Sequence, residues 1–154
     1  MSTYIIARHV ANTILDLSFK EKHPITPLHL QMMLYDIYKQ YYQLTDQLPW
    51  TEPFVASRQG PVLMDIYHAL LTETKQDQPI LKYLPTYEED LTLVKLHKYN
   101  PISHMIVSVW NSCKDTNPQG LLQKITTPGS AWEISRTKNF WYIQPSLIKR
   151  SDTP

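Results

Sequence analysis

The chain has 154 residues, 42% hydrophobic and 19% charged, a composition typical of one folded domain and too apolar for a disordered chain. Fifteen Lys and Arg face fourteen Asp and Glu, so the formal net charge of +1 provides no overall basic field that would hold nucleic acid. No segment has the about 20 apolar residues that a membrane helix needs, and the amino terminus lacks the pattern of a signal peptide. We therefore expect a cytoplasmic protein with neither nucleic-acid nor membrane partners.

The first two predicted elements are amphipathic helices. Residues about 4 to 21 carry apolar side chains at helical spacing, and the predicted second helix covers residues about 26 to 44. Thr26 can cap that helix with its hydroxyl, and Pro27 suits the first helical position. Apolar residues cover most of the second helix, which predicts a central position. The residues that form its main stripe are Leu30, Leu34, Ile37, Tyr38 and Tyr41.

A loop is predicted between the second and third helices. The helical period is lost over residues 45–59, and a small strand pair is expected near residues 52–58. Gly60 permits a tight turn, and we expect Pro61 to open the third helix. That helix takes in Val62 and the apolar positions that follow it at helical spacing, and it fades in the polar run after residue 71.

The second half of the chain repeats the combination of a capping residue and a proline. Asn100-Pro101 and Asn117-Pro118 each predict a helix start. Before them, Thr86 is expected to cap a fourth helix that runs through Leu96. The aromatic segment 132–143 gives no clear pattern, and a final short helix begins at Pro145. The predicted fold is mainly α, a single compact domain of about six helices over residues 1–149, with a flexible tail at 150–154.

The spacing of the histidines and the single cysteine argue against a metal site. Among the six histidines, His23 and His29 are separated by a proline, as are His97 and His104, and a proline breaks a shared helix face. Cys113 alone can form neither an internal disulfide nor a thiolate zinc cluster. We expect no metal and no cofactor.

Catalytic motifs are also missing from the sequence. Cys113 falls on the apolar stripe of a predicted helix, which favours burial as a small hydrophobic residue. The three glycines are isolated from one another, so there is no glycine-rich phosphate loop. We therefore expect a protein that is not an enzyme.

Aromatic residues are the unusual part of the composition. Ten tyrosines and four tryptophans exceed what a helical core of this size usually needs, and both types are enriched at protein interfaces. The best candidates lie where the second helix gives way to the proline-rich loop. The partner-binding residues that we expect are Tyr41, Tyr42, Trp50 and Arg58.

Three stretches of the sequence carry a family resemblance. The first is Ala11 to Leu17, the second runs from Ile25 to Tyr35 (ITPLHLQMMLY), and the third joins ASRQGPV at residues 56–62 to IYHA at residues 66–69. Together they resemble the Panacea domain over residues about 5 to 71, and the later segment 121–132 is similar to that family in outline. The residues that carry the resemblance are Thr26, Pro27, Leu30, Gln31, Leu34, Tyr35, Gly60, Pro61, Tyr67 and Trp132.

The resemblance implies an antitoxin that neutralises a cognate toxin, mostly by direct binding, and in one mode by delivering the toxin to a protease. The alternative is a phage-associated adaptor that acts on host proteins. Most motif residues are expected to have structural roles. Trp132 is expected to be buried in the core, and Gln31 to be a buried amide that hydrogen-bonds the backbone. The sequence departs from the family pattern at Met32, Ser57, Gln59, Thr127 and Ala131. Met32 stands where the family pattern has a lysine, and Thr127 where it has a histidine. If a family activity needed that lysine or histidine, this protein would lack the activity.

Overall fold

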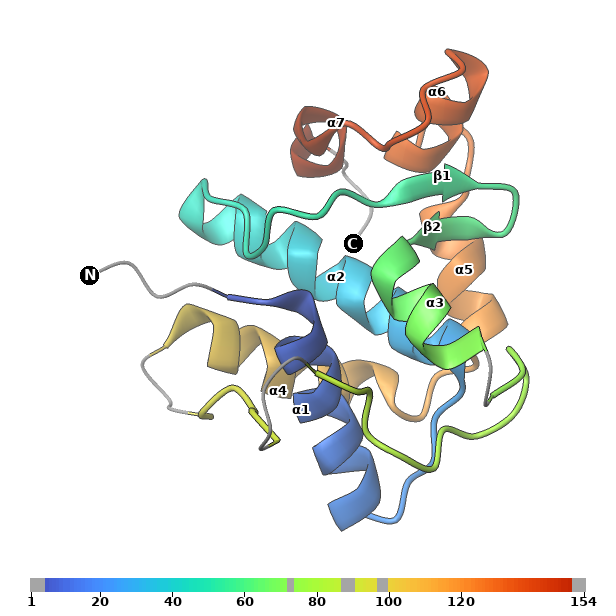
Figure 1. Cartoon of the computed structure of the whole chain (residues 1–154). Coiled ribbons are helices and arrows are strands. Elements are labelled where there is room, and N and C mark those ends of the chain that lie inside the picture. Colours follow the sequence, from blue (N-terminus) through green and yellow to red (C-terminus); the bar gives the residue numbers. More distant parts are fainter. Residues whose placement is uncertain (1–4, 72–73, 87–90, 97–99, 151–154) are drawn as a thin grey trace.

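The computed structural model describes residues 5–71, 74–86, 91–96 and 100–150, and within them the predicted mainly helical fold with a short β-ribbon is confirmed (Figure 1). Seven helices and one two-stranded antiparallel sheet are present in these ranges. The elements in chain order are α1 Ala7–Lys20, α2 Pro27–Thr45, β1 Val55–Ser57, β2 Gly60–Val62, α3 Met64–Leu71, α4 Pro101–Cys113, α5 Pro118–Ile125, α6 Ala131–Thr137 and α7 Pro145–Arg150.

The combination of cap and proline begins three helices, as predicted. Thr26, Asn100 and Asn117 each accept a hydrogen bond from a backbone N–H of the first turn, and a proline follows each of them. The cap distances are 3.2 Å in α2, 3.1 Å in α4 and 2.9 Å in α5. Because the proline has no N–H to leave unpaired, the cap and the proline together reduce the number of unsatisfied donors at the helix start.

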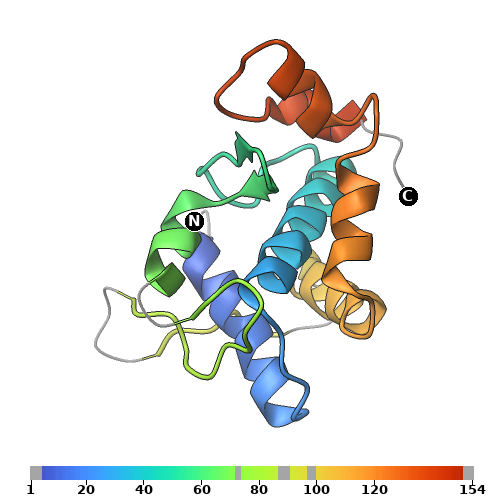
Figure 2. The same ribbon diagram turned by 90° about the vertical axis from the view of Figure 1, so that its right-hand side faces the viewer.

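Helix α2 is the centre of the fold, as its apolar circumference predicts. It contacts α1, α3, α4, α5, α7 and β2. Figure 2 shows it between α1 on one side and α5 on the other. Leu30 and Leu34 on its main stripe have no exposed surface, and one buried cluster extends from Ala7 to Ile148. The core is therefore built around one helix.

Strand β1 lies within the predicted range 52–58, and β2 follows just after it. Strand β1 pairs with β2, with Ala56 opposite Pro61 and Ser57 opposite Gly60. The expectation that Pro61 opens a helix is wrong, because Pro61 and Val62 are in the strand and α3 begins at Met64. The apolar spacing at Pro61 and Val62 favours a helix, but in the structure these residues pair with β1 in the hairpin.

The C-terminal part of the chain adds a third segment beside β1. Val55 and Tyr142 form an antiparallel bridge. The Ala56 N–H donates to the Trp141 carbonyl oxygen at 2.9 Å, and the Ile143 N–H donates to the Phe54 carbonyl oxygen at 2.8 Å. In both views α6 and α7 lie at one end of the molecule, next to the ribbon (Figures 1 and 2).

The predicted fourth helix is wrong where the structure describes it. Residues 91–96 are not helical, and residues 87–90 of that prediction lie outside the described ranges. Side chains of α1 bind the backbone of this part of the chain instead. Asn12, fully buried, accepts from the Leu84 N–H at 2.7 Å and donates to the Leu84 carbonyl oxygen at 3.0 Å. Thr13 Oγ1 accepts from the Val94 N–H at 2.8 Å.

Two short helices complete the C-terminal part. The sequence pattern did not assign α6, although Ser130 caps it by accepting from the Glu133 N–H at 3.1 Å. Helix α7 begins at Pro145, as expected, and it includes Arg150, which was predicted to be part of the tail. Residues 151–154 lie outside the described part of the chain. None of the helices described is long and apolar enough to cross a membrane.

Candidate partner-binding site

A hollow of about 560 Å³ lies between the β-ribbon, the start of α3 and the segment that follows α6, and we call it the hairpin hollow. Its walls combine residues from the middle and from the end of the chain. The residues on which the description below depends are Ala56, Ser57, Arg58, Gln59, Met64, Tyr67, Arg136, Phe140 and Trp141. The hollow is therefore lined by residues from both parts of the third resemblance stretch, 56–62 and 66–69, the latter through Tyr67.

Hydrogen bonds and a close approach hold the tip of the ribbon in place. The Ser57 hydroxyl donates to the Gly60 carbonyl oxygen at 2.7 Å and accepts from the Gln59 N–H at 3.2 Å. Gly60 has a φ of 110°, and a Cβ there would lie 2.5 Å from Leu122 Cδ1. Glycine is therefore needed for the backbone conformation, whereas the Leu122 methyl at the end of a flexible side chain could move aside. Arg58 and Gln59 are left exposed at the tip.

Helix α6 is tied to β1 by two side chains. Trp132 Nε1 donates to the Ser57 carbonyl oxygen at 2.7 Å, and Arg136 Nη1 donates to the Ala56 carbonyl oxygen at 2.8 Å. The guanidinium of Arg136 also lies 5.7 Å from the centre of the Trp132 ring, at cation–π distance. Trp132 is half-buried against the core, so it joins α6 to the ribbon more than it fills the interior. Arg136 is thereby oriented at the wall of the hollow.

Three consecutive aromatic residues after α6 are exposed. The exposed fractions are 39% for Phe140, 68% for Trp141 and 46% for Tyr142. Their backbone is fixed, because the Phe140 N–H donates to the Ser135 carbonyl oxygen at 2.8 Å and the residues that follow pair with β1. Exposed aromatic rings on a fixed backbone suit contact with another protein, since few degrees of freedom are lost on binding.

The four residues predicted to bind a partner do not form one surface. Arg58 lines the hairpin hollow, whereas Tyr41 and Tyr42 are half-buried on α2 and do not line it. Lys149 Nζ lies over the Tyr42 ring, 5.2 Å from its centre. The interpretation of Trp50 as an exposed anchor is wrong, because it is 4% exposed and packs against Tyr38, with ring centres 5.4 Å apart.

Sequence reasoning missed the aromatic triplet of residues 140–142. The available signal was the run Phe140-Trp141-Tyr142 directly after two polar residues, Lys138 and Asn139. Asn139 has a φ of 59°, a conformation that asparagine tolerates better than most residues, and it turns the chain out of α6. The triplet is exposed because it forms the outer segment beside β1 instead of a buried helix face.

The resemblance residues in α2 have structural positions. Leu30, Leu34 and Tyr35 are buried, and Thr26 and Pro27 begin the helix. The expectation for Gln31 is confirmed: its Nε2 donates to the Leu63 carbonyl oxygen at 3.1 Å, and its Oε1 accepts from the Leu63 N–H at 3.0 Å. Gln31 thus fixes the backbone between β2 and α3.

The five departures from the family pattern fall into two groups. Met32 and Ala131 are buried, with exposed fractions of 1% and 2%, so an apolar side chain fits each position. Ser57 and Gln59 are at the ribbon tip, and Thr127 is exposed after α5. Two of the departures therefore change the hairpin hollow itself.

The residues considered in the sequence for metal or nucleophile chemistry include His29 and Cys113, and both are buried. No group of three or more potential metal-ligating side chains exists in the residues the structure describes. His29 Nε2 donates to the Cys113 carbonyl oxygen at 2.8 Å, and burial lowers the pKa of this histidine. Cys113 is buried as predicted, and burial raises the pKa of its thiol, which disfavours the reactive thiolate.

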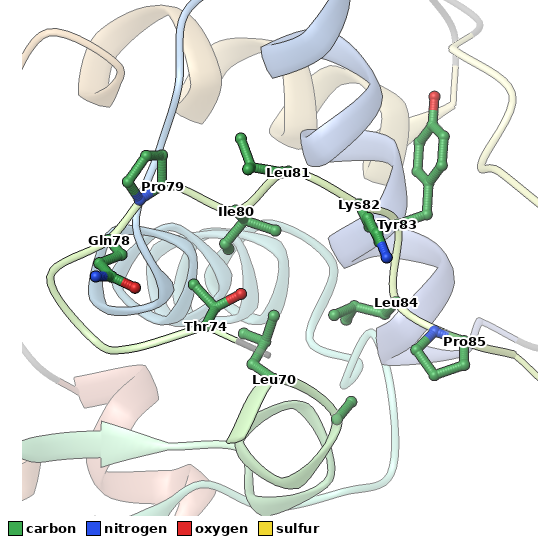
Figure 3. Close-up of a pocket in the computed structure, with 11 residues that line it drawn as sticks. Leu70, Thr74, Gln78, Pro79, Ile80, Leu81, Lys82, Tyr83, Leu84 and Pro85 are labelled. Atoms are coloured by element: carbon green, nitrogen blue, oxygen red, sulfur yellow. The ribbon is translucent and has the colours of Figure 1, made fainter. Parts of the chain in front are cut away.

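A second hollow of about 550 Å³ is lined by residues 78–85 together with Ala69, Leu70 and Thr74 (Figure 3). Leu81 and Tyr83 point away from Leu70 in this view. The Tyr83 hydroxyl bonds Asp16 Oδ1 at 2.7 Å outside the hollow. Of the ten residues that carry the Panacea resemblance, Tyr67 lines the hairpin hollow and none lines this one, where Ala69 is the one lining residue from the three resemblance stretches.

No family model, no curated protein and no solved structure matches the chain, so the resemblance to the Panacea domain depends on its sequence motifs alone.

Proposed function

We propose that the protein is a cytoplasmic antitoxin of the Panacea type that neutralises a toxin by binding it directly at the hairpin hollow. The resemblance supplies the antitoxin class. One observation supports the choice of site above the others: residues of the resemblance stretch 56–62 and Tyr67 line the same hollow as the exposed Phe140 and Trp141. The motif residues and the exposed aromatics meet there although they are far apart in the sequence.

The chemistry of the hollow suits a protein partner. Trp141 offers a large rigid surface with 68% of it accessible, and tryptophan and arginine are the residue types most enriched among those that dominate binding energy. Arg58 is exposed beside it on the ribbon tip. A partner that covers the ring would bury apolar area and exclude water from the arginine, which strengthens any charge pairing there.

A growth assay paired with a binding assay tests the proposal. The protein is co-expressed with the product of the neighbouring gene, and complex formation is measured by co-purification and by calorimetry. Trp141→Ala should weaken the complex by about 2 kcal/mol, about 30-fold, and reduce rescue. Leu44→Ala is the matched control, because Leu44 is 64% exposed and does not line the hollow.

Three kinds of result would contradict the proposal. If the neighbouring gene product is harmless when expressed alone, it is not a toxin, and the antitoxin function is contradicted. Rescue that occurs without a detectable complex, or that is lost only when a host protease is deleted, favours the adaptor function in which the toxin is delivered for proteolysis. Loss of rescue in Leu81→Ala but not in Trp141→Ala would move the binding site to the second hollow, since Leu81 lines that one.

A further inference from the structure

The charged side chains at the hairpin hollow all have the same sign. Among the described residues that line it, the charged ones are Arg58 and Arg136, and none is Asp or Glu. Asp65, next in sequence to the lining residue Met64, is already paired: its two carboxylate oxygens accept from Arg8 at 2.5 and 2.8 Å. The hollow therefore has a local positive charge in a protein whose formal net charge is only +1.

The two arginines differ in how firmly they are held. Arg136 is oriented by its bond from Nη1 to the Ala56 carbonyl oxygen and by the Trp132 ring. A guanidinium has five N–H donors, so the single bond from Nη1 leaves donors that can reach a ligand. Arg58 is exposed at the ribbon tip and can adjust its position. A fixed and an adjustable guanidinium at one hollow can each pair with a carboxylate.

Apolar surface adjoins these charges. Phe140 and Trp141 are exposed, and Met64 and Tyr67 are half-buried in the same wall. A ligand that satisfies the whole hollow therefore needs an apolar group and at least one anionic group close to it, and in an unmodified protein segment the anionic group is a carboxylate.

We propose that the hairpin hollow binds an acidic segment of the partner protein, in which an apolar side chain contacts Trp141 and Phe140 and flanking carboxylates pair with Arg58 and Arg136. This inference depends on the proposed function for the identity of the partner as a toxin, and it adds the chemistry of the segment that the partner presents.

A protein segment fits these observations better than nucleic acid does. A protein groove that binds nucleic acid carries many cations along the path of the phosphate backbone. The described lining of the hairpin hollow has two arginines, and one of them already bonds a main-chain carbonyl. A segment with an apolar side chain and nearby carboxylates matches a hollow lined by exposed aromatic rings and two arginines.

The test uses the whole protein and three labelled probes, with binding followed by fluorescence anisotropy at two salt concentrations. The first probe is a nine-residue peptide with a Phe-Leu pair flanked by glutamates, the second has lysines in place of the glutamates, and the third is a single-stranded oligothymidylate. The variants are Arg58→Glu, Trp141→Ala and, as a control, Lys82→Glu, an exposed lysine at the second hollow.

The acidic peptide should bind, and the lysine peptide should bind at least about tenfold more weakly. Arg58→Glu should weaken the acidic peptide about five- to tenfold and reduce the salt dependence, while Lys82→Glu should leave both unchanged. Equal binding of the two peptides, an unchanged affinity in Arg58→Glu, or tighter binding of the oligonucleotide would each overturn the inference.

The two proposals fail in different ways. If toxin binding requires Trp141 but the acidic peptide does not bind, the acidic segment is wrong and the antitoxin proposal stands. If the acidic peptide binds as expected but no toxin is neutralised, the antitoxin proposal is wrong and the chemistry of the hollow stands. A charge exchange, in which a carboxylate of the toxin is replaced by lysine, should restore binding to Arg58→Glu if both proposals are correct.

Discussion

Gln31→Leu should destabilise the protein strongly, although it replaces a polar residue with an apolar one of similar size. Gln31 is 4% exposed, and Leu63, its backbone partner, has no exposed surface. The variant loses hydrogen bonds of 3.0 and 3.1 Å and leaves the Leu63 N–H without a partner and away from water, whereas the Leu63 carbonyl oxygen still accepts from the Tyr67 N–H at 3.0 Å. A stranded buried donor costs about 1–3 kcal/mol, so we expect a loss of about 2 kcal/mol in the free energy of unfolding.

Thermal unfolding measures this loss. A domain of this size changes its Tm by about 2–4 °C per kcal/mol, so Gln31→Leu should melt about 4–8 °C below the wild type. Gln40→Leu is the matched control on the same helix, because Gln40 is only half-buried and its Nε2 bonds the half-buried Asp36 carboxylate at 2.9 Å. Its effect should stay within about 0.5 kcal/mol. Equal melting temperatures for the two variants would refute the reasoning.

A second substitution at Gln31 separates the hydrogen bonds from packing. Gln31→Glu keeps the shape and keeps an acceptor for the Leu63 N–H, but an ionised carboxylate cannot donate to the Leu63 carbonyl oxygen. Burial raises the pKa of such a carboxyl, and its protonated form can donate. The variant should therefore be least stable at neutral pH and approach the wild type as the pH falls. A difference from the wild type that does not depend on pH would mean that packing, and not donation, decides the effect.

Three further predictions concern the turn, the tryptophans and one histidine. Gly60→Ala should be destabilised by about 1–3 kcal/mol in urea unfolding, because the φ of 110° strains any residue with a side chain. Gly120→Ala has open space around its Cβ on helix α5 and should gain up to about 1 kcal/mol. Trp50→Ala should lose about 3–5 kcal/mol because Trp50 is 4% exposed, while Trp141→Ala should stay within about 0.5 kcal/mol; equal melting temperatures would contradict the assignment of the two residues to core and surface. Burial lowers the folded-state pKa of His29 below the ordinary value of 6.5, so its contribution to stability is present above pH 6.5 and is lost as the pH falls through the folded pKa. Urea unfolding between pH 7.5 and about 5 should show this loss in the wild type and less of it in His29→Gln.

Local signals predicted the helices well where they acted alone. The three capped helix starts at Thr26, Asn100 and Asn117 depend on contacts within one turn, so the sequence contains all the information that they need. The predicted helix through Leu96 failed because its competitor is distant. Thr13 binds the backbone of Val94 across 81 positions of sequence, and no local pattern reports such a contact.

The candidate site was harder to predict than the fold. Arg58, one of the four residues predicted to bind a partner, lines the hairpin hollow, but Trp50 and Trp141 have the same composition signal and opposite exposure. What separates them is their partners: Trp50 packs against Tyr38 and Phe54, and Trp141 is in the outer segment beside β1. The sequence alone shows that the chain has many aromatic residues, but it does not show which of them are buried in the core.

The pairing of β1 with residues 141–143 has a consequence for the order of events during synthesis. The wall made by the ribbon and α3 is complete by Tyr67, but the opposite wall needs Trp141, which is translated about 70 residues later. At about 5–20 residues per second, the ribosome needs several seconds to supply it. A nascent chain therefore has the motif stretch without a binding surface. Under the proposed function, protection would lag behind translation, and a cell would be safest where the antitoxin is made before the toxin.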